Sequence, residues 1–146
     1  MRTVFLGSGD FAVPILDALA AWPGAQLVGV VTTPPRPAGR DATLRPTPVG
    51  IRAAELGLPI LTPDRLREPA AQAAIAALSP ELAVLADYGR IVPQALLDLP
   101  PHGALNLHPS LLPRHRGATP VPAAIAAGDR ETGVSVMRMD AGIDTG

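Results

Sequence analysis

The feature that most constrains the fold of this chain is a series of short apolar runs that recur between glycine and proline residues. The apolar residues within each run are nearly continuous rather than alternating, which is typical of strands that are covered on both faces. The sequence therefore predicts a buried sheet with strands at residues 3–7, 26–32, 82–87, 104–108 and 133–139, and a weaker strand at 59–61.

Helical stretches separate these strands, at residues 10–21, 47–56, 70–78 and 119–127. The second stretch has clear boundary signals, because Thr47 can cap its start, Pro48 takes the first helical position and Gly57 follows its end. Alternation of strand and helix is typical of an α/β fold. We expect an open, mainly parallel sheet with helices on both faces, truncated at its carboxyl end because the chain stops soon after the last predicted strand.

Two proline-containing segments interrupt the alternation. Residues 33–46 are expected to form an ordered but irregular loop, and residues 108–117 cannot be helical because Pro109 and Pro113 break the backbone pattern. Both segments follow predicted strands. Since open α/β sheets bind ligands outside the carboxyl ends of their strands, we expect the functional site at this edge.

Composition excludes several classes of function. With 146 residues, 47% of them hydrophobic, the chain suits one compact domain. Its net charge of −1 gives no global basic field, although every basic residue is an arginine. The absence of cysteine excludes disulfides and thiol chemistry. No apolar run approaches the ~20 residues of a membrane span, and the first residues lack a signal-peptide pattern, so we expect a cytoplasmic protein without a membrane partner.

A glycine-rich turn follows the first predicted strand. Residues 7–12, Gly-Ser-Gly-Asp-Phe-Ala, match the dinucleotide-binding pattern, but the acid expected about twenty residues further on is missing, because Thr32 and Thr33 end the second strand. A nicotinamide enzyme is therefore disfavoured. A tight turn that needs glycine conformations is the simpler interpretation, and an anion site at the helix start stays open.

Asn106, His108 and Asp144 form the most informative polar set. Asn106 and His108 share one side of a strand at its carboxyl end, because side chains alternate along a strand. An amide, an imidazole and a carboxylate could converge on one reacting carbonyl. Asp144 could equally be a turn residue that caps its own loop. The three histidines show no paired spacing for a metal, and Ser110 lies outside a nucleophile elbow.

Longer motifs around these residues resemble a known family. Residues 106–113, Asn-Leu-His-Pro-Ser-Leu-Leu-Pro, followed by matches at 116–118, 127–129, 131–134, 139–140 and 143–146, strongly resemble the folate-dependent formyltransferases. Residues 9–14 and the Arg-Pro-Ala-Gly-Arg stretch at 36–40 look like the branch whose acceptor is methionyl-tRNA. The resemblance implies a Rossmann-like fold. It covers only the catalytic domain, here incomplete over residues 1–146, without the carboxy-terminal barrel domain that helps to hold tRNA.

The resemblance also implies roles for individual residues. Asn106, His108 and Asp144 are the expected catalytic residues. The expected folate-binding residues are Ser110, Leu111, Leu112, Pro113, Tyr88, Ile91 and Val92. The expected tRNA-binding residues are Arg36, Arg40 and Arg45, in a loop that Asp41, Ala42 and Thr43 make less basic than is usual in the family.

The expected function is transfer of a formyl group from 10-formyltetrahydrofolate to the amino group of methionyl initiator tRNA in translation initiation. No metal and no protein partner are implied. Because His-Pro-Ser also occurs in glycinamide ribonucleotide formyltransferases, a small acceptor such as that ribonucleotide or an amino-sugar nucleotide is an alternative. A folate-binding fragment without turnover is another.

Overall fold

A single mixed sheet forms the centre of the molecule. The computed structural model describes residues 1–38, 42–140, 142 and 144–146. Within these residues six strands lie in the order β5-β2-β1-β6-β7-β8. Their bounds are β1 (Arg2–Gly7), β2 (Gln26–Val31), β5 (Ile60–Leu61), β6 (Leu82–Ala86), β7 (Ala104–His108) and β8 (Ser135–Arg138). All neighbouring pairs are parallel except β7 and β8, which are antiparallel.

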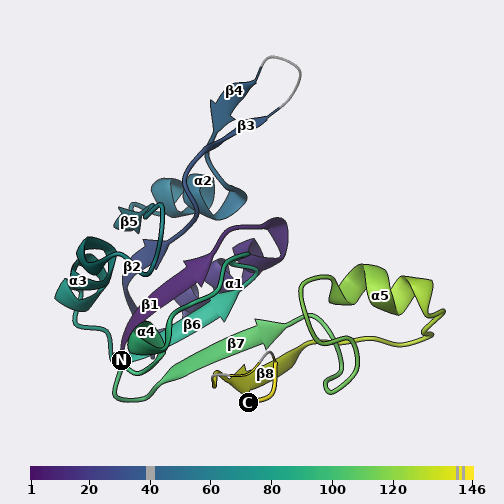
Figure 1. The fold of residues 1–146 in the computed structure, drawn as a ribbon. Helices are drawn as coiled ribbons and strands as arrows, with labels where there is room; N and C mark the ends of the chain where they lie inside the picture. The colour runs from purple at the N-terminus through teal and green to yellow at the C-terminus, as the bar shows by residue number, and fades with distance from the viewer. Residues whose placement is uncertain (39–41, 141, 143) are drawn as a thin grey trace.

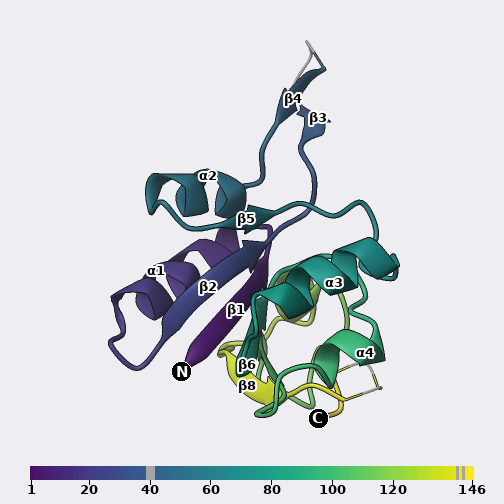
Figure 2. The same cartoon turned by 90° about the vertical axis from the view of Figure 1, so that its left-hand side faces the viewer.

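Helices cover both faces of this sheet, as Figure 2 shows. Their bounds are η1 (Asp10–Ala12), α1 (Val13–Ala21), α2 (Pro48–Glu55), α3 (Pro69–Ala77), α4 (Gln94–Leu97) and α5 (Pro120–Ala126). On one face Phe5 and Val30 pack with Leu16 of α1. On the other face Leu6 and Leu85 pack with helices α3 and α4. The expected Rossmann-like α/β fold is therefore confirmed. None of the helices in the described ranges is long and apolar enough to cross a membrane.

Local sequence signals predicted most of the helices and strands correctly. The six predicted strands are all present, with ends shifted by one or two residues. Thr47 caps α2 by accepting a hydrogen bond from the Gly50 amide at 2.9 Å, and Gly57 takes a φ of +66° just beyond the helix. Helix α4 was not predicted, because its four residues are too few to show a helical period.

The expectation of an irregular loop at residues 33–46 was wrong. This segment contains an antiparallel hairpin of β3 (Arg36–Ala38) and β4 (Thr43–Arg45), which projects away from the sheet in Figure 1. The prolines of this segment, Pro37 among them, favour a loop over a strand in the interior of a sheet. Both strands of a two-stranded ribbon are edges, however, and an edge tolerates a proline because its missing N–H can face solvent.

The strand order also fixes where a ligand can bind. From β1 the chain first builds one side of the sheet with β2 and β5, and then builds the other side with β6, β7 and β8. The order reverses between β1 and β6, and ligands of open α/β sheets bind at such a switch point, outside the strands' carboxyl ends. β7 ends one strand further along the same edge, at His108.

Candidate active site

His108 is the last residue of β7 and is almost buried, with 5% of its surface exposed. Its Nδ1 lies 3.7 Å from Oδ2 of Asp144. Its Nε2 donates a hydrogen bond to the carbonyl oxygen of His115 at 3.0 Å. Nε2 therefore makes a hydrogen bond to a carbonyl, whereas Nδ1 faces a carboxylate at a distance longer than a hydrogen bond.

Asn106 lies two residues earlier on the same face of β7. Its register partner on β6 is Leu85, which belongs to the apolar core beneath α3 and α4. Within the described residues the Asn106 amide makes no hydrogen bond to the protein. It is therefore a donor that a ligand on this face could use.

Asp144 contacts residues that are far from it in the sequence. Its Oδ2 accepts a hydrogen bond from the backbone N–H of Gly117 at 2.7 Å, besides facing His108. The local turn is capped by another carboxylate, because Oδ1 of Asp140 accepts from the Gly142 N–H and from the Thr145 hydroxyl. The structure therefore places the Asp144 carboxylate beside the His108 ring.

Hydrogen bonds from two serine hydroxyls stabilise the segment after β7. Ser110 is fully buried, and its hydroxyl donates to the carbonyl of Arg114 at 2.7 Å. The hydroxyl of Ser135, on β8, donates to the Ser110 carbonyl at 2.8 Å and accepts from the Leu112 N–H at 3.1 Å. The two serines therefore shape the loop, and the Ser110 side chain faces the protein. Ser135 was missed from the sequence, because only the pairing of β7 with β8 places it opposite His108.

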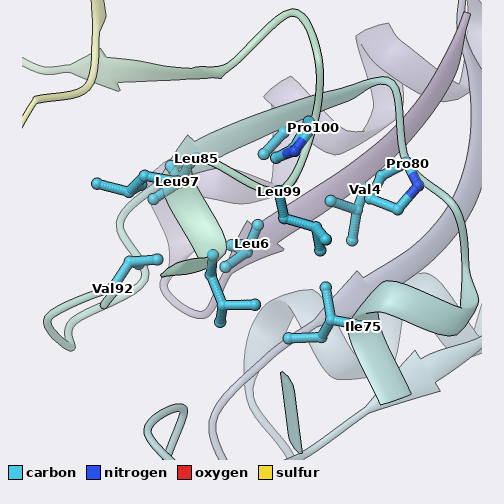
Figure 3. Close-up of a pocket in the computed structure, with 11 residues that line it drawn as sticks. Val4, Leu6, Ile75, Pro80, Leu85, Val92, Leu97, Leu99 and Pro100 are labelled. Carbon is cyan, nitrogen blue, oxygen red and sulfur yellow. The ribbon is translucent and has the colours of Figure 1, made fainter. Parts of the chain in front are cut away.

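A small apolar cavity lies on the same face of the sheet (Figure 3). It is lined by Val4, Leu6, Ile75, Pro80, Ala83, Leu85, Val92, Leu96, Leu97, Leu99 and Pro100. Its volume of about 10 Å³ holds one water-sized sphere, whereas ligand pockets usually measure ~300–1,000 Å³. A ligand of ordinary size could enter this cavity only if the side chains around it moved apart.

The structure separates the residues expected to bind folate. Val92 lines the cavity, and Tyr88 is buried in the adjoining core, where its hydroxyl has no hydrogen-bond partner among the described residues. Ile91 is 81% exposed and Leu111 is 49% exposed, so both lie at the surface. Leu112 is half-buried and Pro113 is exposed.

The glycine-rich turn after β1 is bonded to its own chain. The N–H groups of Ser8 and Gly9 both donate to the backbone carbonyl of Asp87, at 3.0 and 3.2 Å. A Cβ on Gly9 would lie 1.9 Å from the Asp87 carboxylate, which explains the glycine. These two amides are occupied within the protein, as a tight turn would have them. The expected reason for the glycine was wrong, however, because Gly9 has an ordinary φ of −83° and is required by the close approach of Asp87. Burial, together with the nearby charge of Asp10, raises the pKa of the Asp87 carboxyl group.

The arginines expected to contact RNA lie on the hairpin. Arg36 and Arg45 are exposed and stand directly opposite one another in the β3–β4 ladder. Arg40 lies outside the described residues. Over the described ranges no three histidine, aspartate or glutamate side chains gather as a metal site would require.

Comparison with known proteins shows which family this chain resembles. The formyl transferase family matches residues 1–146. The chain is 57% identical over 146 residues to a protein of Cereibacter sphaeroides named methionyl-tRNA formyltransferase, covering 100% of this chain and 48% of the relative. A protein of the same name from Thermus thermophilus is 53% identical, with 100% of this chain and 47% of the relative covered. The chain spans about half the length of the curated relatives it matches.

Solved structures agree with this placement. Glycinamide ribonucleotide transformylase 1 from Symbiobacterium toebii superposes with a TM-score of 0.76 at 29% identity, covering 100% of this chain and 69% of that chain. A sugar N-formyltransferase from a Shewanella species has a TM-score of 0.65 at 19% identity over 99% of this chain and 53% of that one, which is a likeness of fold alone. By its sequence over all 146 residues and by its fold, the chain belongs to the formyl transferase family.

Proposed function

We propose that the gene product containing this chain transfers a formyl group from 10-formyltetrahydrofolate to the amino group of methionyl initiator tRNA. The observation that carries the proposal is the His108–Asp144 pair at the carboxyl end of β7. Support for the acceptor comes from the relatives named methionyl-tRNA formyltransferase, which are 53–57% identical over the whole chain.

The proposed reaction begins when the neutral amine of the acceptor attacks the formyl carbon. A carbon–nitrogen bond forms to the amine, the bond from that carbon to the folate nitrogen breaks, and the proton lost by the amine ends on the folate nitrogen. Negative charge develops on the formyl oxygen in between. The loss of one donor to such an oxygen typically slows an enzyme by ~10²–10³.

Two side chains on one face of β7 are suited to meet that oxygen. The Asn106 amide is an available donor. His108 would have to exchange one of its two present contacts, because Nε2 already donates to the His115 carbonyl and Nδ1 faces Asp144. Asp144 would hold the imidazole in place and help to relay the proton of the amine, a role typically worth ~10²–10⁴ in rate.

The loop at residues 110–113 would hold the folate. Prolines at 109 and 113 limit its conformations, which lowers the entropy cost of presenting backbone groups to a ligand. Leu85 and Val92 would supply apolar contacts to the pterin once their cavity widens. We expect Leu112→Asp to abolish binding of tetrahydrofolate, with Leu44→Asp on the exposed hairpin as the control. Unchanged affinity in Leu112→Asp would move the folate site elsewhere.

The hairpin of β3 and β4 would contact the tRNA. Arg36 and Arg45 face solvent side by side on a ribbon that projects from the sheet (Figure 1). Together with Arg40 they would neutralise phosphates, giving a slope of roughly −2 to −3 for the logarithm of affinity against the logarithm of salt concentration.

The deciding experiment is formyl transfer by the complete gene product with three acceptors: methionyl-tRNA, glycinamide ribonucleotide and an amino-sugar nucleotide. We expect transfer to methionyl-tRNA alone. Transfer to a small acceptor instead would replace the proposed acceptor, and folate binding without transfer to any of them would remove the catalytic proposal.

A further inference from the structure

A second cluster of charged side chains lies beside the site and has no part in the chemistry proposed above. Nε2 of His115 lies 2.6 Å from Oδ2 of Asp129, and Nη2 of Arg114 lies 2.5 Å from Oδ1 of the same carboxylate. The His115 and Asp129 side chains are 15% and 10% exposed, whereas that of Arg114 is 61% exposed. Asp129 follows α5, so the contact joins the segment after β7 to the segment after that helix.

The backbone of His115 belongs to the candidate active site even though its ring points to Asp129. Its carbonyl oxygen accepts the hydrogen bond from Nε2 of His108. Two residues later, the Gly117 N–H donates to Asp144. The short stretch from 115 to 117 therefore contacts both members of the His108–Asp144 pair through its main chain.

The backbone conformation of His115 must be stabilised by contacts with other residues. Its φ is +53°, in the left-handed region that non-glycine residues seldom adopt. Such conformations persist when the surrounding contacts over-determine them. The ring contact with Asp129 is one such contact. It fixes the side chain against Asp129 while the carbonyl of the same residue accepts from His108.

We propose that His115 and Asp129 form a positioning pair for His108: their side-chain contact holds the His115 carbonyl against Nε2 and so selects the orientation and tautomer of the His108 ring. That this ring is catalytic rests on the proposed function. A neutral His108 held in this way carries its proton on Nε2, because a carbonyl can only accept.

The contact between His115 and Asp129 persists near neutral pH. The hydrogen bond from His115, and after it the contacts of Arg114, hold the pKa of the Asp129 carboxyl group below its usual range, against an opposing effect of burial. Asp129 therefore stays ionised near neutral pH. His115 can donate from Nε2 either as the cation or as the neutral Nε2–H tautomer.

The test compares two replacements of His115 in the complete gene product. His115→Leu removes the donor, whereas His115→Gln keeps an N–H group of similar reach. Asp129→Asn keeps an acceptor oxygen without the charge and provides a second route should the leucine variant fail to fold. His102→Leu is the matched control, because His102 is exposed and precedes β7, at the end of that strand away from His108.

Two quantities are measured: the ¹⁵N shifts of the His108 ring, which report its tautomer, and the split between kcat and KM for formyl transfer. We expect His115→Leu to mix the His108 tautomers and to lower kcat by about 10- to 100-fold, the size of effect that follows misplacement of a catalytic group, with KM changed less than about twofold. His115→Gln should restore both measurements to near the parent values, and Asp129→Asn should fall between them.

Unchanged His108 shifts in His115→Leu would overturn the proposal, and so would equal losses in the leucine and glutamine variants, which would indicate a merely structural role. Shifts that change as expected in a protein that transfers no formyl group would uphold the positioning pair and refute the proposed function.

Discussion

The loop after β7 offers a prediction whose size follows from two hydrogen bonds. Ser135→Ala removes the hydroxyl that donates to the Ser110 carbonyl and accepts from the Leu112 N–H. At a net value of about 1 kcal/mol each, the two bonds contribute about 2 kcal/mol to docking of the loop. That amount corresponds to roughly a 30-fold change in the ratio of docked to undocked loop.

Folate affinity should follow the population of the docked loop. Because an apparent dissociation constant rises as the competent fraction falls, the constant for tetrahydrofolate should rise severalfold and by no more than about 30-fold. Hydrogen exchange of the Leu112 amide should accelerate within the same limit. Titration calorimetry gives the first quantity, and exchange followed by NMR gives the second.

Two control variants separate the hydroxyl from the strand. Ser135→Thr keeps a hydroxyl and should behave like the parent protein. Val136→Ala changes the next residue of β8, which is exposed, and should leave the loop unaffected. If Ser135→Ala leaves both the tetrahydrofolate affinity and the Leu112 exchange rate within twofold of the parent values, Ser135 does not hold the loop and the reasoning is refuted.

Three further predictions concern stability, pH and the acceptor. Thr47→Ala should lower the free energy of unfolding, measured in urea, by about 2 kcal/mol, because it removes the α2 cap and the 2.5 Å partner of the buried Thr32 hydroxyl. Thr47→Ser keeps the hydroxyl and should not lower it. A loss below about 0.5 kcal/mol in the alanine variant would contradict the capping role. Burial and a neighbouring carboxylate raise the pKa of Asp87, so its ionisation opposes folding above that pKa. Asp87→Asn should therefore raise the midpoint of urea unfolding at pH 7. The gain should vanish below pH ~3.9, where the carboxyl group is protonated even in the unfolded chain. An equal gain at both pH values would exclude titration of Asp87 as the cause. Arg45→Ala should lower transfer to methionyl-tRNA severalfold at unchanged tetrahydrofolate affinity, and equal losses of both would assign Arg45 to the fold.

The fold was largely predictable because its signals are local. Continuous apolar runs marked the buried strands, and a threonine, a proline and a glycine marked the bounds of α2. The direction of β8 was not predictable in the same way, because an apolar pattern is the same for a parallel and an antiparallel strand. The β3–β4 hairpin was missed because Pro37 opposes a strand anywhere except at an edge.

The candidate site was predictable only where one residue carried the signal. His108 stands at a strand exit, and motifs around it resembled the family to which the chain belongs. Ser135 and Asp129 carry no such signal, because a serine in a short strand and an aspartate after a glycine are common. Their contacts with the loop after β7 arise from strand register and chain reversal over 14 to 25 residues. Local sequence patterns do not indicate strand register or chain reversal.

The central claim is that the His108–Asp144 pair at the end of β7 is the centre of formyl transfer, and one comparison tests it most directly. Formylmethionyl-tRNA formation is measured for the complete gene product and for its Asp144→Asn variant, with tetrahydrofolate affinity measured alongside. Asparagine keeps the shape and an acceptor for the Gly117 N–H but loses the charge that faces His108. We predict that kcat falls by about 10²-fold or more while tetrahydrofolate affinity is retained. Full activity in Asp144→Asn would contradict the account.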